Sequence, residues 1–211
     1  MTHIDTIERT KRMKIIGLTG GIGSGKSFVA GVAENKFPVL HISTDEIARR
    51  QMQKDGISFK RVVKTFSKYT DCLLSEDGEI NRPELSKIVM NDPKLLKKLD
   101  KITHPAVIDE LYTIISIEKS RGNYSAVLIE TALLYEAGID EMCDEVWYVY
   151  APVSTRSSRL MEKRGYTPEK TEMFLKNQQS EEEFLKRADR TVPNGADVTE
   201  EDMIHIISAY L

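Results

Sequence analysis

The chain of 211 residues has little of several features that would narrow its function. Its two cysteines, Cys72 and Cys143, lack CxxC spacing and a histidine near them in sequence, so we expect reduced structural thiols. No apolar run is long enough to span a membrane, and no signal-peptide core precedes the first glycine cluster. The net charge of −3 gives no electrostatic reason to expect nucleic-acid binding. We therefore expect a cytoplasmic protein without membrane or nucleic-acid partners, of undetermined oligomeric state.

The rest of the composition is that of a globular protein, with 40% apolar and 30% charged residues. This length suits one α/β domain or one such domain with a helical insertion. The charged, aperiodic start predicts an N-terminal extension at 1–13 ahead of a single domain at 14–211. Met13, directly before the first apolar run, is a possible alternative translation start.

One glycine-rich segment carries the strongest functional signal. Residues 20–27, GGIGSGKS, fit the pattern G-x-x-x-x-G-K-[ST] of the loop that wraps nucleoside triphosphate phosphates. A buried strand is expected at 14–19 and a helix at 28–33, which is the context that such a loop requires. A merely flexible glycine turn is the alternative. The expected ATP-binding residues here are Gly21, Ile22, Gly23, Ser24, Gly25, Lys26, Ser27 and Phe28.

Two side chains of this loop and one distant acid indicate the chemistry. Lys26 is expected to reach the β- and γ-phosphates as a catalytic residue, and Ser27 to hold Mg²⁺ through its hydroxyl. Glu130 ends a buried strand at a place where P-loop enzymes often put an acid that reaches the metal. The alternative for Glu130 is a plain strand-terminal carboxylate. The expected cofactors are ATP and Mg²⁺.

Apolar runs that alternate with helical stretches predict a parallel sheet with crossover helices. We therefore expect a three-layer α/β P-loop NTPase fold with a mostly parallel five-stranded sheet. The candidate strands lie near 14–19, 38–42, 124–130, 145–150 and 190–192.

A long stretch between the second and third strands has helical rather than strand periodicity. Helices are expected at 82–90, 93–102 and 105–121, each with a lysine-rich outer face. Because this stretch is too long for one crossover helix, we expect a helical lobe at about 56–121 that encloses the acceptor substrate.

The second strand ends where a further acid and an arginine open a helix. In a doubly wound sheet this strand end lies in the ligand crevice, so Asp45 is expected to orient the attacking hydroxyl as a catalytic residue. Arg49, one turn later, is expected to pair with a substrate phosphate. The alternative for Asp45 is a helix cap.

Three arginines follow the fourth strand: Arg156, Arg159 and Arg164. They precede Gly165, which separates two expected helices. Such a segment suits a lid that clamps the transferring phosphate, at about 156–178. We expect Arg159 and Arg164 to act as catalytic lid groups and Arg156 to be solvated; a surface ion pair is the alternative for each.

Together, these motifs resemble the dephospho-CoA kinase family from about residue 14 to the C-terminus. Among the departures from the family pattern, Phe28 replaces a small residue, Ala132 a proline and Phe174 an arginine. The segment GLTGGIGSGKS at 17–27, the HP pair at 104–105, Gln178 and the A-D…N ending at 188–194 match the family pattern. Two elements match with a change: DAD-x-x-x-R at 43–49 has Ser43 for the first acid, and R-L-x-x-R at 159–164 has its last arginine displaced by one residue. The strand end at 130–136 is similar to D-x-P-L-L-F-E.

The resemblance implies ATP- and Mg²⁺-dependent phosphorylation of the ribose 3′-hydroxyl of dephospho-CoA, which gives coenzyme A and ADP. It implies acceptor contacts from Arg49, His104 and Glu136, with His104 expected at a helix start. It also places Asn194 near the adenine of ATP, although an ordinary turn residue is the alternative there.

Two other readings share part of these signals. A kinase of a nucleoside monophosphate or a sugar acid would have the same loop, sheet and lid. A GTP-dependent switch protein would read guanine with N-K-x-D, but the pair at 35–36 lacks that aspartate. An ABC-type ATPase is disfavoured because its serine-glycine-glycine-glutamine signature is missing.

Overall fold

The computed structural model describes residues 12–176 and 178–211, which divide into two compact units. The first unit contains the described residues up to 42 together with 118–134 and 140–211; the second contains 43–117 and 135–139. Of the expected extension at 1–13, only Arg12 and Met13 are described. Arg12 pairs with Asp144 at 3.0 Å, and Met13 is buried.

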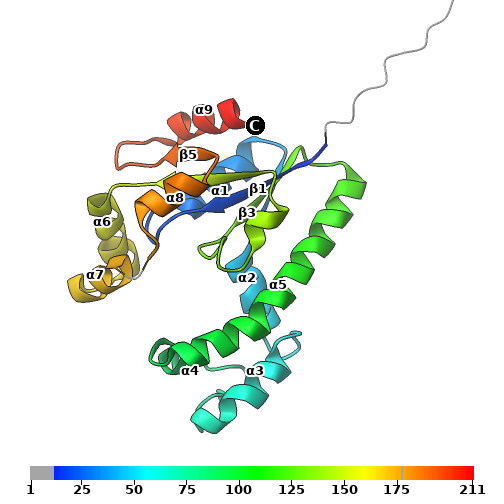
Figure 1. Cartoon of the computed structure of the whole chain (residues 1–211), viewed down its shortest axis with the longest axis vertical. Helices are drawn as coiled ribbons and strands as arrows, with labels where there is room; N and C mark the ends of the chain where they lie inside the picture. The colour runs from blue at the N-terminus through cyan, green and yellow to red at the C-terminus, as the bar shows by residue number, and fades with distance from the viewer. Residues whose placement is uncertain (1–11, 177) are drawn as a thin grey trace, which may run out of the picture. The chain divides into compact units, whose positions relative to one another are not determined.

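The first unit is built on a five-stranded sheet with the strand order β2-β3-β1-β4-β5 (Figure 1). β1 pairs in parallel with β3 on one side and with β4 on the other, and β4 pairs in parallel with β5. Every strand lies where an apolar run predicts it. Their bounds are β1 (Lys14–Thr19), β2 (Val39–Ser43), β3 (Ala126–Glu130), β4 (Glu145–Tyr150) and β5 (Arg190–Pro193).

Helices cover both faces of this sheet, as a three-layer fold requires (Figure 1). On one face, α1 (Lys26–Lys36) and α9 (Glu200–Tyr210) bury their apolar residues against the strands. On the other face, Phe184 of α8 (Glu181–Arg187) stacks on Tyr148, with ring centroids 4.9 Å apart. The predicted layered α/β fold is confirmed. The core of the first face is Ile16, Leu18, Val29, Ala30, Val32, Ala33, Val39, Ala126, Leu128, Trp147, Val149, Val192, Met203 and Ile207.

The expected lid segment forms two short helices. α6 (Val153–Arg164) ends at Gly165, whose φ of 62° is left-handed, and α7 (Pro168–Lys176) follows. The Thr167 hydroxyl accepts a hydrogen bond from the Lys170 amide at 3.3 Å and so caps the start of α7.

The second unit is helical, and its apolar residues form a core of their own. Its helices are α2 (Thr44–Gln51), α3 (Phe59–Phe66), the 3₁₀ helix η1 (Ser67–Tyr69), α4 (Arg82–Met90) and most of α5 (Pro93–Arg121). That core consists of Val62, Phe66, Leu73, Ile80, Leu85, Val89, Leu95 and Ile102.

One helix prediction in this unit is wrong. The segments 93–102 and 105–121 form the single helix α5, with Pro105 inside it, so His104 does not lie at a helix start. An internal proline loses a backbone bond and costs about 3 kcal/mol. Burial continues on both sides of the proline, at Ile102 and Val107, and this packing offsets the loss.

After β3, residues 134–138 form turns that lead into the 3₁₀ helix η2 (Ile139–Met142). Among the described residues, no helix is both long and apolar enough to cross a membrane.

Candidate active site

The glycine loop joins β1 to α1 and turns its backbone into unusual conformations. Gly23 and Gly25 have φ values of 78° and 92°, a region that other residues adopt only with strain. A side chain at Gly25 would also collide with the Asn194 amide. No described side chain caps the start of α1, and its first turn holds no acid. The start of α1 therefore carries the partial positive charge of a helix N-terminus with no described capping side chain, which favours an anion there.

The loop carbonyls are fastened by side chains from outside the loop. Arg159 donates to the Ser24 carbonyl at 3.1 Å and to the Gly195 carbonyl at 3.0 Å. Asn194, which is buried, donates to the same Ser24 oxygen at 2.7 Å. Within the loop, Lys26 also donates to the Gly20 carbonyl at 2.8 Å. The loop is therefore held by two side chains from distant segments and by its own Lys26.

Arg156 is not the solvated residue that the sequence suggested. Its Nε donates to the Ile22 carbonyl at 2.9 Å, and its Nη2 bonds to the Gln178 side chain. Gln178 in turn accepts from the Ile22 amide at 3.2 Å. Burial lowers the pKa of the Arg156 guanidinium. The tip of the loop is therefore gripped at both polar groups of Ile22.

Glu130 lies at the end of β3 beside the start of α1. Its Oε1 accepts from the Ser27 hydroxyl at 2.6 Å, and its Oε2 lies 2.9 Å from His41 Nε2. Burial alone would raise the pKa of Glu130. The hydrogen bonds from His41 and Ser27, with the charges of His41 and Lys26, outweigh burial and hold this pKa below its ordinary value. Glu130 is therefore an ionised carboxylate in contact with Ser27.

The pair formed by Ser27 and Glu130 fits a magnesium ion chemically. A hydroxyl oxygen and an ionised carboxylate oxygen are hard ligands of the kind that Mg²⁺ prefers. Among the described residues, no group of three or more His, Cys, Asp or Glu side chains could hold a metal ion. Mg²⁺ at this pair would therefore share its coordination with phosphate oxygens and water.

In the second unit, Asp45 occupies the first turn of α2. The helix cap is Ser43, whose hydroxyl accepts from the Glu46 amide at 3.4 Å, so the capping alternative for Asp45 is wrong. Asp45 is exposed. Arg49, also exposed, lies 4.0 Å from Glu46, and its carbonyl accepts from Arg82.

The remaining predicted residues are at the surface or half-buried. His104 lies 3.6 Å from Asp100 one turn earlier in α5. Glu136 is exposed in the turns after β3, and Arg164 is exposed at the end of α6. Phe28, in the first turn of α1, is 39% exposed.

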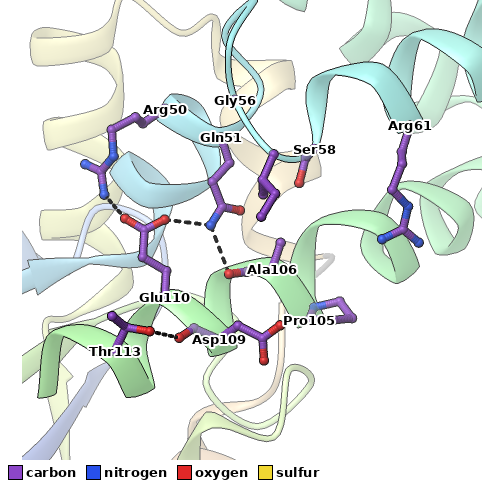
Figure 2. A pocket seen from close by; sticks show the side chains of 11 residues that line it. Arg50, Gln51, Gly56, Ser58, Arg61, Pro105, Ala106, Asp109, Glu110 and Thr113 are labelled. Atoms are coloured by element: carbon purple, nitrogen blue, oxygen red, sulfur yellow. Dashed lines mark hydrogen bonds and ion pairs between the residues drawn. The ribbon is translucent and has the colours of Figure 1, made fainter. Parts of the chain in front are cut away.

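The second unit contains a cavity of about 550 Å³ that no motif had indicated (Figure 2). It lies between the end of α2, the segment 56–61 and the middle of α5. Gln51 donates to the Ala106 carbonyl at 2.9 Å and to Glu110 at 2.7 Å, and Arg50 pairs with the same carboxylate. This network ties α2 to α5 along one wall.

On the opposite wall, two polar side chains lack partners among the described residues. Arg61 lines the cavity and makes no ion pair with any residue that the structure describes. Ser58 is buried, and its hydroxyl has no hydrogen-bond partner within the described ranges. The cavity therefore presents a cation and an uncommitted hydroxyl.

The sequence reasoning missed His41, the role of Arg156 and the cavity. Strand alternation was the signal for His41, since Val39 is a core residue and His41 follows it on the same face. Nothing in the local pattern showed which of the three arginines faces the loop.

A sequence model of the dephospho-CoA kinase family matches residues 14–200. The chain is similar to the dephospho-CoA kinase of Moorella thermoacetica, with 36% identity over 88% of this chain and 86% of the relative. It is similar to that of Carboxydothermus hydrogenoformans, with 33% identity over 94% of this chain and 95% of the relative.

Solved structures are also similar to this chain. A Thermus thermophilus protein has a TM-score of 0.75 and 30% identity, covering 95% of this chain and 97% of that one. Dephospho-CoA kinase from Campylobacter jejuni has a TM-score of 0.66 and 25% identity, covering 93% and 96%. A shikimate kinase from Bacteroides thetaiotaomicron, with 11% identity and a TM-score of 0.55, shares the fold alone.

Proposed function

The chain belongs to the dephospho-CoA kinase family, and we propose that it transfers the γ-phosphate of ATP to the ribose 3′-hydroxyl of dephospho-CoA. The products are coenzyme A and ADP, and the reaction is the last step of coenzyme A biosynthesis. The carrying observation is the glycine loop, whose carbonyls accept hydrogen bonds from Arg159 and Asn194, and which leads into the start of α1, where no described side chain caps the helix. The two free cysteines agree with a cytoplasmic location.

On the nucleotide side, the loop would enclose the triphosphate of ATP. Lys26 is positioned on the loop to neutralise the β- and γ-phosphates once it leaves the Gly20 carbonyl. Ser27 and Glu130 would hold Mg²⁺, which when bound neutralises charge on the phosphate oxygens. Asn194 would support the adenine end indirectly, because its amide is committed to the Ser24 carbonyl.

Asp45 would align the acceptor hydroxyl and accept its proton late in the transfer. Its exposed carboxylate is not consumed by capping, because Ser43 does that work. A loose transition state needs orientation of the hydroxyl more than a strong base, and the Asp45 side chain would supply that orientation.

The two lid arginines would act in different ways. Arg164, exposed at the end of α6, is free to contact the transferring phosphate, as a closing lid requires. Arg159 contributes by holding the loop, through its bonds to the Ser24 and Gly195 carbonyls.

The helical unit would bind dephospho-CoA. Arg49, His104 and Glu136 remain the proposed contacts, and the cavity shown in Figure 2 adds a concave site of a size that suits a small-molecule group. Arg61 on its wall offers a cation to one of the acceptor phosphates.

The test is a coupled assay of ADP release with dephospho-CoA, AMP or gluconate as acceptor. We expect activity with dephospho-CoA alone, and ³¹P NMR of the product should show a new 3′-phosphomonoester. Phosphorylation of AMP or gluconate in preference to dephospho-CoA would overturn the proposal.

A further inference from the structure

His41 is a half-buried histidine in contact with the proposed metal-binding pair, and neither the motifs nor the proposed mechanism uses it. Its Nε2 lies 2.9 Å from Glu130 Oε2, while Glu130 Oε1 accepts from the Ser27 hydroxyl at 2.6 Å. The side chains of His41 and Glu130 are 19% and 11% exposed, so water competes little for this contact.

The fold explains why these side chains meet. β2 and β3 are neighbours in the sheet. Val39 and Leu128 belong to the core that α1 covers, and side chains two positions further along a strand point to the same face. His41 and Glu130 therefore both point toward α1, whose second residue is Ser27.

The hydrogen positions follow from the contacts. Glu130 Oε1 accepts from the Ser27 hydroxyl, Oε2 lies within hydrogen-bonding distance of His41 Nε2, and carboxylate oxygens accept hydrogen bonds. His41 Nε2 therefore donates to Oε2. With Oε2 engaged in this way, Oε1 is the oxygen that faces Ser27.

A third group stands behind the histidine. The Nδ1 atom of His41 lies 3.9 Å from Glu34 Oε2 on α1. Ser27 and Glu34 are seven residues apart, or about two helical turns, and so lie on one face of α1. The ring is thus placed between the sheet and the same helix that begins at the glycine loop.

We propose that His41 is a positioning residue for the divalent ion. It fixes the rotation of the Glu130 carboxylate, so that one oxygen is held by the ring and the other is presented beside the Ser27 hydroxyl. Partners of this kind orient metal-binding carboxylates, and their removal typically costs about 10- to 100-fold in metal affinity or activity. The inference rests on the proposed function for the identity of the ion.

The test measures metal binding apart from turnover. Binding of Mn²⁺ in the presence of ADP is followed by electron paramagnetic resonance, and binding of ADP without metal by calorimetry. For His41→Ala we expect Mn²⁺ affinity to fall by about 10- to 100-fold with metal-free ADP binding unchanged. His41→Gln, whose amide nitrogen can donate at a similar reach, should recover most of the loss.

His205→Ala is the matched control. His205 is exposed on α9, and its Nδ1 lies 2.8 Å from the Glu201 carbonyl one turn earlier, so the His205→Ala variant should bind Mn²⁺ like the wild type. Thermal melting of each variant separates loss of the site from loss of the fold. Wild-type Mn²⁺ affinity in a folded His41→Ala protein would overturn the proposal.

A double-mutant cycle tests whether His41 acts through Glu130. If it does, His41→Ala added to Glu130→Gln should weaken Mn²⁺ binding by no more than about twofold further. Full additivity would overturn the assignment. Because no acceptor is present, failure with dephospho-CoA in the coupled assay would refute the proposed function and leave this result unaffected.

Discussion

The two units differ in how completely their polar groups are engaged. In the sheet unit, Arg156, Arg159 and Asn194 all donate hydrogen bonds to carbonyls of the glycine loop. In the helical unit, Asp45 is exposed and Arg61 has no ion pair within the described ranges. The proposed nucleotide site is therefore held by hydrogen bonds within the protein, whereas the proposed acceptor site presents exposed polar groups.

Replacing Asp45 on α2 by a neutral residue should have the largest effect on turnover. This change tests whether the helical unit contributes a catalytic residue. We expect Asp45→Asn to lower kcat by about 10²- to 10⁴-fold, the usual contribution of a positioned acid–base group. ATP binding should stay near normal. The measurement is steady-state kinetics beside ATP titration, with exposed Glu46→Gln as the control. Unchanged kcat would remove Asp45 from the mechanism.

Removing a side chain that holds the glycine loop should have the next largest effect, which we expect on KM for ATP. Arg156→Ala removes a charged donor from the Ile22 carbonyl and from Gln178. Hydrogen bonds to charged groups contribute about 1.5–3 kcal/mol, so KM for ATP should rise about 10- to 100-fold. Lys163→Ala, at an exposed position of the same helix, is the control. A KM for ATP equal to that of the control would mean that the loop holds its shape unaided.

A change in the cavity should have a smaller effect, which distinguishes binding of dephospho-CoA from binding of ATP. Arg61→Ala should raise KM for dephospho-CoA by up to about tenfold and leave KM for ATP unchanged, because one solvated phosphate contact is lost. Lys60→Ala, exposed and outside the cavity lining, should change neither value. Equal KM values for dephospho-CoA in the two variants would place the acceptor elsewhere.

The smallest effect concerns the thiols, one in each unit. Burial, with lesser contributions from Asp140 and Asp144, raises the pKa of Cys143 in the sheet unit to about 12. Cys143 therefore stays a neutral thiol at pH 8, whereas Cys72 in the helical unit is exposed. Iodoacetamide at pH 8, followed by peptide mass analysis, should label Cys72 first. Faster labelling of Cys143 would contradict its burial.

Local sequence patterns predicted much of the sheet unit. β1, β3 and β4 are built around continuous apolar runs, and the segment 20–27 carries its own signature, so both features are visible without distant contacts. The helical unit was predicted less completely. Pro105 is a strong local sign of a helix boundary, but burial on both sides of it carries α5 through.

The residues that were missed depend on partners far away along the chain. His41 matters because β3 places Glu130 beside it, 89 residues later. Arg156 reaches Ile22 across 134 residues, and its local surroundings look like any charged helix. Spacing within one segment cannot reveal such pairings, because they are set by strand order and by helix orientation.

The way the loop is fastened has a consequence for the order in which the protein matures during synthesis. Residues 20–27 leave the ribosome well before Arg159 and Asn194, whose side chains hold the Ser24 carbonyl. A ribosome-bound nascent chain should therefore gain affinity for nucleotide only after Asn194 has emerged. The binding loop is translated long before it becomes competent.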